Sequence, residues 1–381
     1  MKKLTPMQRQ YLELKKQYSD CILLFRLGDF YEMFNEDAKV ASKDLDIVLT
    51  SRGEGVSKWP MCGVPHHAVE SYVAKLLEKG HTVAVADQVE DASQAKGLVK
   101  RDVVRVVTPG TVLESGMLED STNNYLVALI QHDDTIGIAA VDVSTGEFIA
   151  TELKASYTSE EILNELGRLK PTEILLPESA SKQHGILEQL EEPGIKLTFR
   201  NDLDFSASSA EDRLKEQFGV ATLDGYGLGN KAVALGAAGA ILAYLEQVHR
   251  ANASTLTGIR TYTTAAFMVV DSTTQRNLEL IKNARDGSSR GTLLSVLSKT
   301  ITSMGKRKLK QWILQPLMKI PEINNRLDAV EELARTAMDR KAVTDTLHNL
   351  GDLERITSRI VFGVSNAREL LSLRRALERL P

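Results

Sequence analysis

The stretch Leu24-Phe-Arg-Leu-Gly-Asp-Phe-Tyr-Glu-Met-Phe34 decides how the first part of the chain folds. Its apolar first half predicts a buried strand, which Gly28-Asp29 ends in a turn. If the chain returns as a second strand, Phe30 and Glu32 lie two residues apart and point to the same face. An aromatic ring and a carboxylate would then face one ligand. Taken alone, the run is more typical of core packing with a surface glutamate, so its function depends on the flanking sequence.

The flanking sequence predicts a small mixed α/β domain over residues 1–115. Thr5-Pro6 is an N-cap and first-turn pair that opens a helix through Lys16. A second helix is expected to start at Asn35 as its cap, and a third, with an apolar face from Val69 to Leu77, is followed by a glycine. Strands are expected at residues 22–27, 47–50, 83–89 and 103–107.

Two further parts follow this domain. Residues 116–123 are polar and predict a linker. Residues 124–245 predict a three-stranded meander followed by βα units, which is typical of an α/β layer fold with a mixed sheet. The pattern turns helical from about residue 230, with a long Ala-rich helix at 231–248 in which Gly236 and Gly239 allow close packing, and residues 246–381 are expected to form the start of a helical domain. We therefore expect an α+β multidomain protein whose last part is a partial all-α domain.

Further local patterns refine these two parts. A helix is expected after Thr158 and Glu161, which have capping-box spacing, and another helix is expected between strands at 172–176 and 195–199. In the last part, Pro321 suits the first turn of a helix with an apolar face, and another helix is expected over 365–380. That face is formed by Ile323, Leu327, Val330 and Ala334.

The distribution of charge leaves a nucleic-acid partner open. The net charge of −4 argues weakly against a strongly basic nucleic-acid binder. Residues 1–115 hold 16 basic and 16 acidic residues, whereas residues 271–320 hold ten basic and three acidic residues, an excess of seven. Such an excess usually indicates a solvated helical face, although a run such as Lys306-Arg307-Lys308 also suits DNA phosphates or a neighbouring domain.

Cysteine content and hydropathy indicate the compartment. Cys21 and Cys62 are far apart and lack metal-ligand spacing, which fits a reducing compartment better than a disulfide framework. No apolar stretch approaches the roughly 20 residues that a membrane helix needs, and the N-terminus lacks the apolar run of a secretory signal. We therefore expect a cytoplasmic protein.

Five motifs occur in order along the first domain and change the weight given to Phe30 and Glu32. They are Gly28–Phe34, Ala38–Ser42, Leu45–Gly53, Pro60–Ala68 and Val104–Thr111. Together they resemble the mismatch-binding domain of the MutS family of mismatch repair proteins. In the same way, Asp142–Phe148 resembles the connector domain of that family, and residues 271–317 resemble the start of its helical core.

The resemblance implies a role for individual residues. Phe30 would insert from the minor groove and stack on a mispaired or unpaired base, and Glu32 would hydrogen-bond to that base. An aromatic wedge kinks the duplex, and unstacking costs less where pairing is already broken. Arg52 and Arg105 match family positions near DNA and would contact phosphate or sugar, while Met61 would pack near the wedge. Solvated arginines and a turn methionine are equally good interpretations of these last three.

The charge of Glu32 has a consequence of its own. A carboxylate near phosphates is repelled, so Glu32 is expected to penalise fully paired DNA and to favour a duplex with an accessible base. The partners implied are double-stranded DNA with mismatches or small insertion loops, and a MutL-type repair protein at the connector, which would have an RNase H-like fold. The alternative function is a protein-interaction module that recruits repair partners through the connector and does not bind DNA.

The sequence argues against catalysis by this chain. The family uses a P-loop ATPase, whose Gly-x-x-x-x-Gly-Lys-[Ser/Thr] loop cradles phosphates, and this pattern is absent here. Gly305-Lys306 has Thr300 in place of the first glycine and Arg307 in place of the Ser or Thr. The resemblance implies that the ATPase module and a DNA clamp would follow residue 381, so ATP and Mg²⁺ are expected only for the longer family members. The family dimerises through those missing parts, so this chain is expected to be monomeric.

Metal-dependent chemistry is not expected either. Asp142 lies in a strand that would suit a nuclease site, but no set of further carboxylates accompanies it. The adjacent pair His66-His67 lacks a third ligand and is more typical of a helix start. We expect no metal site, no resident cofactor and no catalytic residues.

Overall fold

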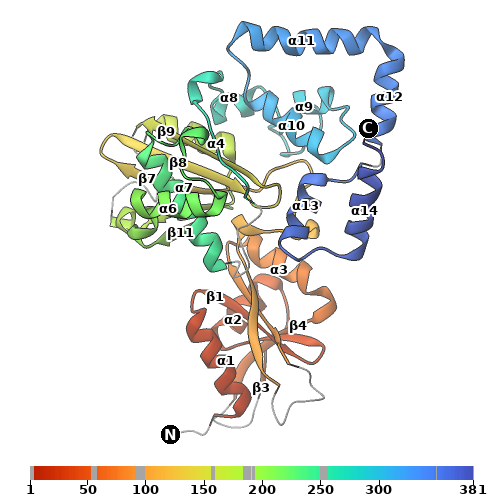
Figure 1. Ribbon diagram of the computed structural model, residues 1–381. Helices are drawn as coiled ribbons and strands as arrows, with labels where there is room; N and C mark the ends of the chain where they lie inside the picture. The colour runs from red at the N-terminus through yellow and green to blue at the C-terminus, as the bar shows by residue number, and fades with distance from the viewer. Residues whose placement is uncertain are drawn as a thin grey trace.

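A computed structural model describes residues 4–52, 58–90, 99–155, 159–182, 190, 194–248, 256–348 and 350–380. These residues form three parts that follow one another along the chain (Figure 1). A sheet domain with the N-terminus lies at the bottom of the view, a second sheet domain lies above it, and helices make up the rest. The α+β multidomain organisation predicted from the sequence is confirmed. None of the described helices is long and apolar enough to cross a membrane.

The first sheet is mixed, with its strands in the order β3-β4-β2-β1-β5-β6. β1 and β5 are parallel, and all other neighbours are antiparallel. Strands were correctly predicted near β1, β5 and β6, and β2 follows the predicted turn. The six strands are β1 (Cys21–Leu27), β2 (Phe30–Phe34), β3 (Thr50–Arg52), β4 (Trp59–Pro65), β5 (Thr82–Gln88) and β6 (Arg101–Val107).

Helices cover both faces of the first sheet. α1 (Pro6–Gln17) begins at Thr5, as predicted, and Thr5 and Gln8 exchange side-chain and backbone hydrogen bonds in a capping box. Tyr11 of α1 packs edge-on against two phenylalanines of the sheet. The opposite face is covered by α2 (Asn35–Leu45) and by α3 (Val69–Glu78), whose apolar side was predicted from its spacing.

Two local predictions in this domain are wrong. Asn35 is not a cap: it has φ of +54° and is already inside α2, whose N-cap is Phe34 without a side-chain hydrogen bond. The strand expected at 47–50 begins only at Thr50, because Asp46 ends α2 in the left-handed region and the chain then runs irregularly. Val48 and Leu49 of that apolar run are exposed.

The second sheet is also mixed, in the order β11-β10-β7-β8-β9-β12. β7, β8 and β9 form the predicted antiparallel meander, and β10 and β11 add parallel strands beside β7. This is the mixed α/β layer expected of an RNase H-like domain. Its strands are β7 (Leu126–His132), β8 (Thr135–Asp142), β9 (Glu147–Lys154), β10 (Glu173–Pro177), β11 (Lys196–Arg200) and β12 (Arg260–Thr261).

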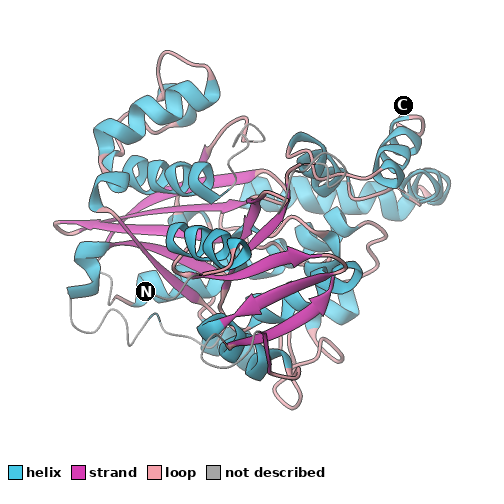
Figure 2. Cartoon of the chain, turned by 90° about the horizontal axis from the view of Figure 1, so that it is seen from below, coloured by secondary structure: helices cyan, strands magenta, loops and turns pink. Residues whose placement is uncertain are grey.

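The helices of this domain pack closely on the sheet and on each other. α4 (Glu160–Leu169) contributes to the core on one face, and α7 (Ala232–Val248) with α6 (Ala207–Phe218) to the core on the other. Figure 2 shows from below how helices lie against the strands. The close packing predicted for Gly239 is confirmed, since an added Cβ there would lie 2.3 Å from the Cβ of Ala210.

The predicted end of the second domain differs from the end seen in the structure. The limit between residues 245 and 246 falls within α7, and β12 adds residues 260–261 to the second sheet. A short 3-10 turn at Ser115–Met117 overlaps the start of the predicted linker at 116–123, and an irregular segment follows it. Thr158 of the predicted capping box lies outside the described residues, as does most of the helix expected between β10 and β11. α4 begins after Ser159.

The third part is helical and loosely packed. Its described core centres on three residues, Leu280, Ile281 and Leu314. α11 starts with Pro321 in its first turn, as predicted, but none of its residues is buried, so its apolar face from Ile323 to Ala334 is not packed within the described chain. α11 runs across the top of the molecule (Figure 1). The helices are α8 (Ser272–Asn277), α9 (Leu293–Leu297), α10 (Ser303–Leu314), α11 (Ile320–Arg335), α12 (Ala337–Leu347), α13 (Leu353–Val361) and α14 (Ala367–Leu377).

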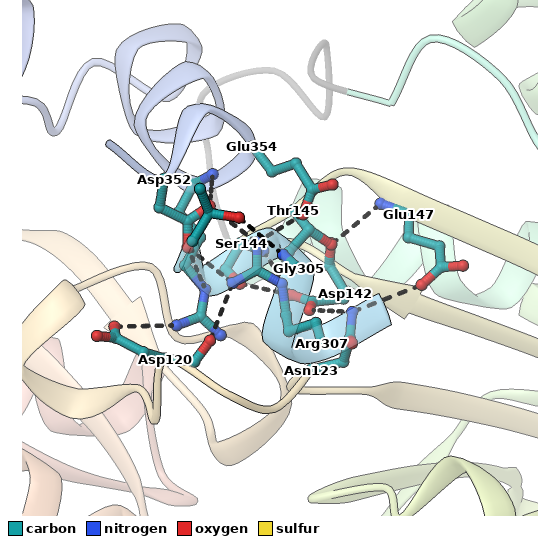
Figure 3. A network of polar contacts seen from close by, with 12 residues as sticks. Asp120, Asn123, Asp142, Ser144, Thr145, Glu147, Gly305, Arg307, Asp352 and Glu354 are labelled. Carbon is teal, nitrogen blue, oxygen red and sulfur yellow. Dashed lines mark hydrogen bonds and ion pairs between the residues drawn. The ribbon is translucent and has the colours of Figure 1, made fainter. Parts of the chain in front are cut away.

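Two buried arginines fasten the segment between the sheets to this helical part. Figure 3 shows one of them, Arg307, with its carboxylate partners. Arg307 of α10 is only 5% exposed and donates both terminal nitrogens to the carboxylate of Asp352, at 2.7 and 2.8 Å. It also donates to Glu354 at 2.6 Å and to the carbonyl of Asp120 at 3.2 Å. Burial opposes charge on Arg307 and Asp352, but their hydrogen bonds raise the pKa of the arginine and lower that of the carboxyl.

Arg355 of α13 completes this arrangement, which we call the joint (Arg307, Asp352, Arg355 and the carbonyls of 119–122). Arg355 is 3% exposed and donates to the carbonyls of Glu119 and Thr122, at 3.0 and 2.6 Å. The expectation that the basic residues line a solvated helical face is therefore wrong for Arg307. Its guanidinium is buried because the carboxylate of Asp352 and the backbone carbonyl of Asp120 bind it there. The neighbouring Lys308 is exposed and donates a hydrogen bond to Gln311 on its own helix at 3.0 Å.

Candidate nucleic-acid interface

The candidate site begins at the turn between β1 and β2. Leu27 and Phe30 are register partners, so the turn consists of Gly28 and Asp29 alone, as predicted. Gly28 has φ of +60°, which suits glycine at the first central position of a two-residue hairpin. The backbone N–H of His66 donates to the carbonyl of Asp29 at 2.8 Å and ties the turn to the end of β4. The turn is therefore short, and a backbone hydrogen bond from the end of β4 fixes its position.

Phe30 and Glu32 point to one face of β2, as the spacing predicts. Tyr31 and Met33 alternate with them and are buried beneath α2 and α3. Phe30 is 48% exposed, whereas Phe34 further along the same face is buried against Tyr11. The aromatic ring at the turn is thus outside the core, while the rest of its strand anchors it.

Arg52 joins this pair from the edge strand β3. Its Nη1 lies 2.5 Å from Oε2 of Glu32. The Arg52 side chain is 47% exposed and that of Glu32 is 13% exposed. The structure therefore brings three of the sequence-predicted residues together: an exposed ring, a carboxylate beside it and an arginine on that carboxylate. We call Phe30, Glu32 and Arg52 the tip.

Met61 and Arg105, the other two predicted site residues, lie outside the tip. Met61 of β4 is half-buried, pairs in register with Phe34 and packs against the core, so it supports the face that carries the tip. Arg105 lies on β6, at the opposite edge of the sheet from β3, and forms an ion pair with Glu114. Arg105 also lines a cavity with Phe362 and Val364 of the helical part. The structure does not bring Arg105 together with the tip.

Two residues that shape the tip were not singled out from the sequence. Gly63 is the register partner of Glu32, and an added Cβ would lie 3.5 Å from Cγ of Glu32 and 3.9 Å from Cδ1 of Phe30. Glycine therefore keeps the space beside both side chains open. Arg26 stacks 5.3 Å from the ring centroid of Tyr31 and donates to the carbonyl of Gly28, bracing the turn from the other face. Gly63 lies inside the motif Pro60–Ala68, which was the available signal.

Asp142 serves the local fold of the second domain. Its carboxylate accepts hydrogen bonds from the N–H and hydroxyl of Ser144, at 2.9 and 2.7 Å, and from Asn123 and the N–H of Asn124. Burial raises the pKa of the Asp142 carboxyl, against these hydrogen bonds, which lower it. Within the described ranges, no three His, Cys, Asp or Glu side chains are grouped to hold a metal ion.

The carboxylate of Glu173 links the first two domains and was not singled out from the sequence. Glu173 of β10 is fully buried and accepts hydrogen bonds from Thr198 and Tyr244, both at 2.7 Å, and from the N–H of Gly110 at 3.0 Å. The hydroxyl of Thr108 donates to it as well. The motif ending at Thr111 therefore closes the first domain onto the second, through contacts that are distant in sequence.

Comparison with known families assigns all three parts of the chain. Family models described as MutS domain I, MutS domain II and MutS domain III match residues 5–116, 124–257 and 273–381. They match in the order in which the two sheet domains and the helical part occur. The chain belongs to the MutS family.

Individual relatives agree with this assignment. Over the whole chain, it is 44% identical to the DNA mismatch repair protein MutS of Symbiobacterium thermophilum and 42% identical to that of Methanosarcina barkeri. Over 98% of the chain, it is 44% identical to the DNA mismatch repair protein MutS of Pelotomaculum thermopropionicum. The chain spans 44%, 44% and 43% of the lengths of these relatives.

Proposed function

We propose that this chain recognises mismatched or unpaired bases in double-stranded DNA for mismatch repair. The observation that carries the proposal is the half-exposed ring of Phe30, held on a two-residue turn beside the carboxylate of Glu32. Core packing would bury such a ring, and a loop would not fix its direction. The relatives' name, DNA mismatch repair protein, supports the same function.

The proposed mechanism uses each tip residue differently. Phe30 enters the minor groove and stacks on a base whose pairing is broken, and stacking on an aromatic ring is worth about 1–3 kcal/mol for any base. Glu32 accepts a hydrogen bond from the same base, because its carboxylate is an acceptor. Arg52 supplies a positive charge next to them for the DNA backbone. Met61 supports this face from β4 without contacting DNA itself.

A fluorescence-anisotropy titration tests this function directly. We expect the chain to bind a labelled duplex with one G·T mismatch more tightly than the same duplex fully paired. Competition with unlabelled matched duplex at fixed salt is the control, because phosphate contacts alone bind both duplexes equally. Equal affinity for the two duplexes, or no binding to either, would contradict the proposal.

The second candidate function is a protein-interaction module. A cavity of about 120 Å³ favours it, because its walls include Phe267, Met268 and Val269 and it lies between α4 and the segment after β12. Met268 and Val269 are exposed apolar side chains, a feature common at interaction sites. A MutL-type repair protein is the partner that we propose for this domain. In the titration above, this function alone predicts no binding to either duplex.

We further propose that this chain is not itself an ATPase. The sequence lacks the glycine-rich loop that would cradle the phosphates, and Arg307, which stands where such a loop has Ser or Thr, is bound by Asp352. Release of inorganic phosphate from ATP by the purified chain, with and without mismatched duplex, should stay at background. We also propose a monomeric chain that acts in the cytoplasm, whereas longer family members are expected to dimerise.

A further inference from the structure

The ion pair at the tip joins Glu32 and Arg52, and each of these side chains has a proposed contact with DNA. Within the described part of the chain, Glu32 and Arg52 are each other's charged partner, with 2.5 Å between Nη1 and Oε2. Nearly half of the Arg52 side chain is exposed, so its remaining N–H donors face solvent. While the pair is intact, Glu32 occupies the arginine and Arg52 screens the carboxylate. The repulsion expected between Glu32 and phosphates is therefore coupled to the availability of Arg52.

This pair is suited to exchange rather than to stability. Because Arg52 is 47% exposed, solvent screens the pair and its side chain loses freedom on pairing, so we expect the pair to change an equilibrium by about fivefold even though Glu32 is only 13% exposed. A phosphate competes well for a guanidinium, because two N–H groups can bind two phosphate oxygens at once. Arg52 can therefore leave Glu32 for a phosphate once the carboxylate has another hydrogen-bond partner.

We propose that Arg52 is a specificity-determining residue that changes partner when a mismatch is bound. On paired DNA, Glu32 finds no free base N–H and keeps Arg52. At an unpaired base, Glu32 accepts a hydrogen bond from an exposed N–H of that base, and Arg52 turns to the nearest phosphate. Recognition of the base and binding of the backbone are then a single event. This inference rests on the proposed function and adds to it a reason why a correct base strengthens the phosphate contact.

A double-mutant cycle separates exchange from simple repulsion. The variants are Glu32→Gln, Arg52→Gln and the double variant, titrated with a labelled matched duplex and with a duplex that carries one unpaired thymine. If the exchange operates, Glu32→Gln frees Arg52 and tightens matched DNA about fivefold at about 0.15 M salt, with a salt slope steeper by about 0.9, the value of one phosphate contact. Arg52→Gln alone weakens matched DNA only slightly, because the Glu32 carboxylate loses its screening, and weakens the thymine duplex about fivefold. In the double variant, the tighter binding of matched DNA that Glu32→Gln produces is lost.

Glu36→Gln is the matched control. Glu36 forms an exposed ion pair with Lys39 on α2 at 2.6 Å, and α2 covers the opposite face of the sheet. This substitution makes the same change in net charge and also frees a cation, but away from the tip. We expect no change in affinity for either duplex beyond the general effect of one charge. Thermal melts of all variants check that the fold is retained.

Two results would overturn the inference. If Glu32→Gln tightens matched DNA equally in the presence and absence of Arg52, the gain comes from lost repulsion and Arg52 changes no partner. If Arg52→Gln weakens matched and mismatched DNA by the same factor, Arg52 is an ordinary phosphate contact. In both cases wild type still prefers the thymine duplex, so the proposed function survives. Equal affinity of wild type for both duplexes would instead remove the proposed function and the inference together.

Discussion

The tip and the joint both place arginines against carboxylates, but they differ in how completely those groups are satisfied. Arg52 makes one ion pair with Glu32, and 47% of its side chain is exposed. Arg307 makes four hydrogen bonds and is 5% exposed. Exposed pairs are worth about 0–1 kcal/mol, whereas breaking a buried pair costs about 3–5 kcal/mol. The same chemistry therefore holds domains together at one place and remains free to change partners at the other.

The largest expected effect follows from breaking the joint. Arg307→Met keeps the length of the side chain but leaves Asp352 without its two strongest donors, and we expect the free energy of unfolding to fall by about 3 kcal/mol. The pKa of Asp352 is lowered in the fold, so its contribution is present above its ordinary pKa of 3.8 and is lost as the pH falls through the folded value. The difference from wild type in chemical denaturation should therefore close in acid.

Two further variants sharpen this test. Arg307→Lys keeps the charge but not the planar fork, and should recover only part of the loss. Arg52→Met at the tip makes the same change at an arginine that is 47% exposed, beside a carboxylate about as buried as Asp352, and should lower stability by about 1 kcal/mol. Equal losses for Arg52→Met and Arg307→Met would mean that burial does not distinguish the two regions.

A smaller effect is expected at Phe30, and it concerns DNA rather than stability. Phe30→Ala should reduce the preference for a G·T duplex by about 1–3 kcal/mol, the value of one stacked base, while affinity for matched DNA stays near that of wild type. The ring is half-exposed, so the thermal melt should hardly move. Phe34→Ala, on the same face but buried, is the control that should lower the melting temperature. A large drop for Phe30→Ala would place its ring in the core.

The smallest effect is expected at Arg105. Its ion pair with Glu114 is partly exposed and lies at the opposite edge of the sheet from β3. Arg105→Gln should lower stability by about 1 kcal/mol or less and leave the mismatch-to-matched affinity ratio unchanged. Titration of both duplexes at two salt concentrations is the measurement. A shallower salt dependence for both would instead assign Arg105 to the DNA backbone, as the family resemblance implied.

Local patterns predicted most of the secondary structure around the candidate site. Gly28-Asp29 marked the turn, and the spacing of Phe30 and Glu32 gave the face, because both depend on neighbours within the chain. The strand expected at 47–50 failed because an apolar run alone does not say whether a partner strand is within reach. Only Thr50–Arg52 pairs with β4.

Contacts between distant residues could not be predicted in this way. Arg52 and Glu32 are 20 residues apart, and Arg307 reaches Asp352 across 45. Composition showed a basic excess around Arg307 but not which of its charges the fold would bury. Glu173 sits within a correctly predicted strand, yet its role as an acceptor for Thr108 and Tyr244 depends on the packing of two domains.

The two-residue turn at Gly28-Asp29 also limits how this chain can change over evolution. Successive residues of a strand alternate between faces, so one inserted or deleted residue before Phe30 would exchange the two faces of β2. Phe30 and Glu32 would then point toward α2 and α3, and the buried Tyr31 and Met33 would point to the face that carries the tip and α1. The number of residues between Leu27 and Phe30 is therefore more constrained than their identity, and substitutions should be tolerated here far more often than changes in length.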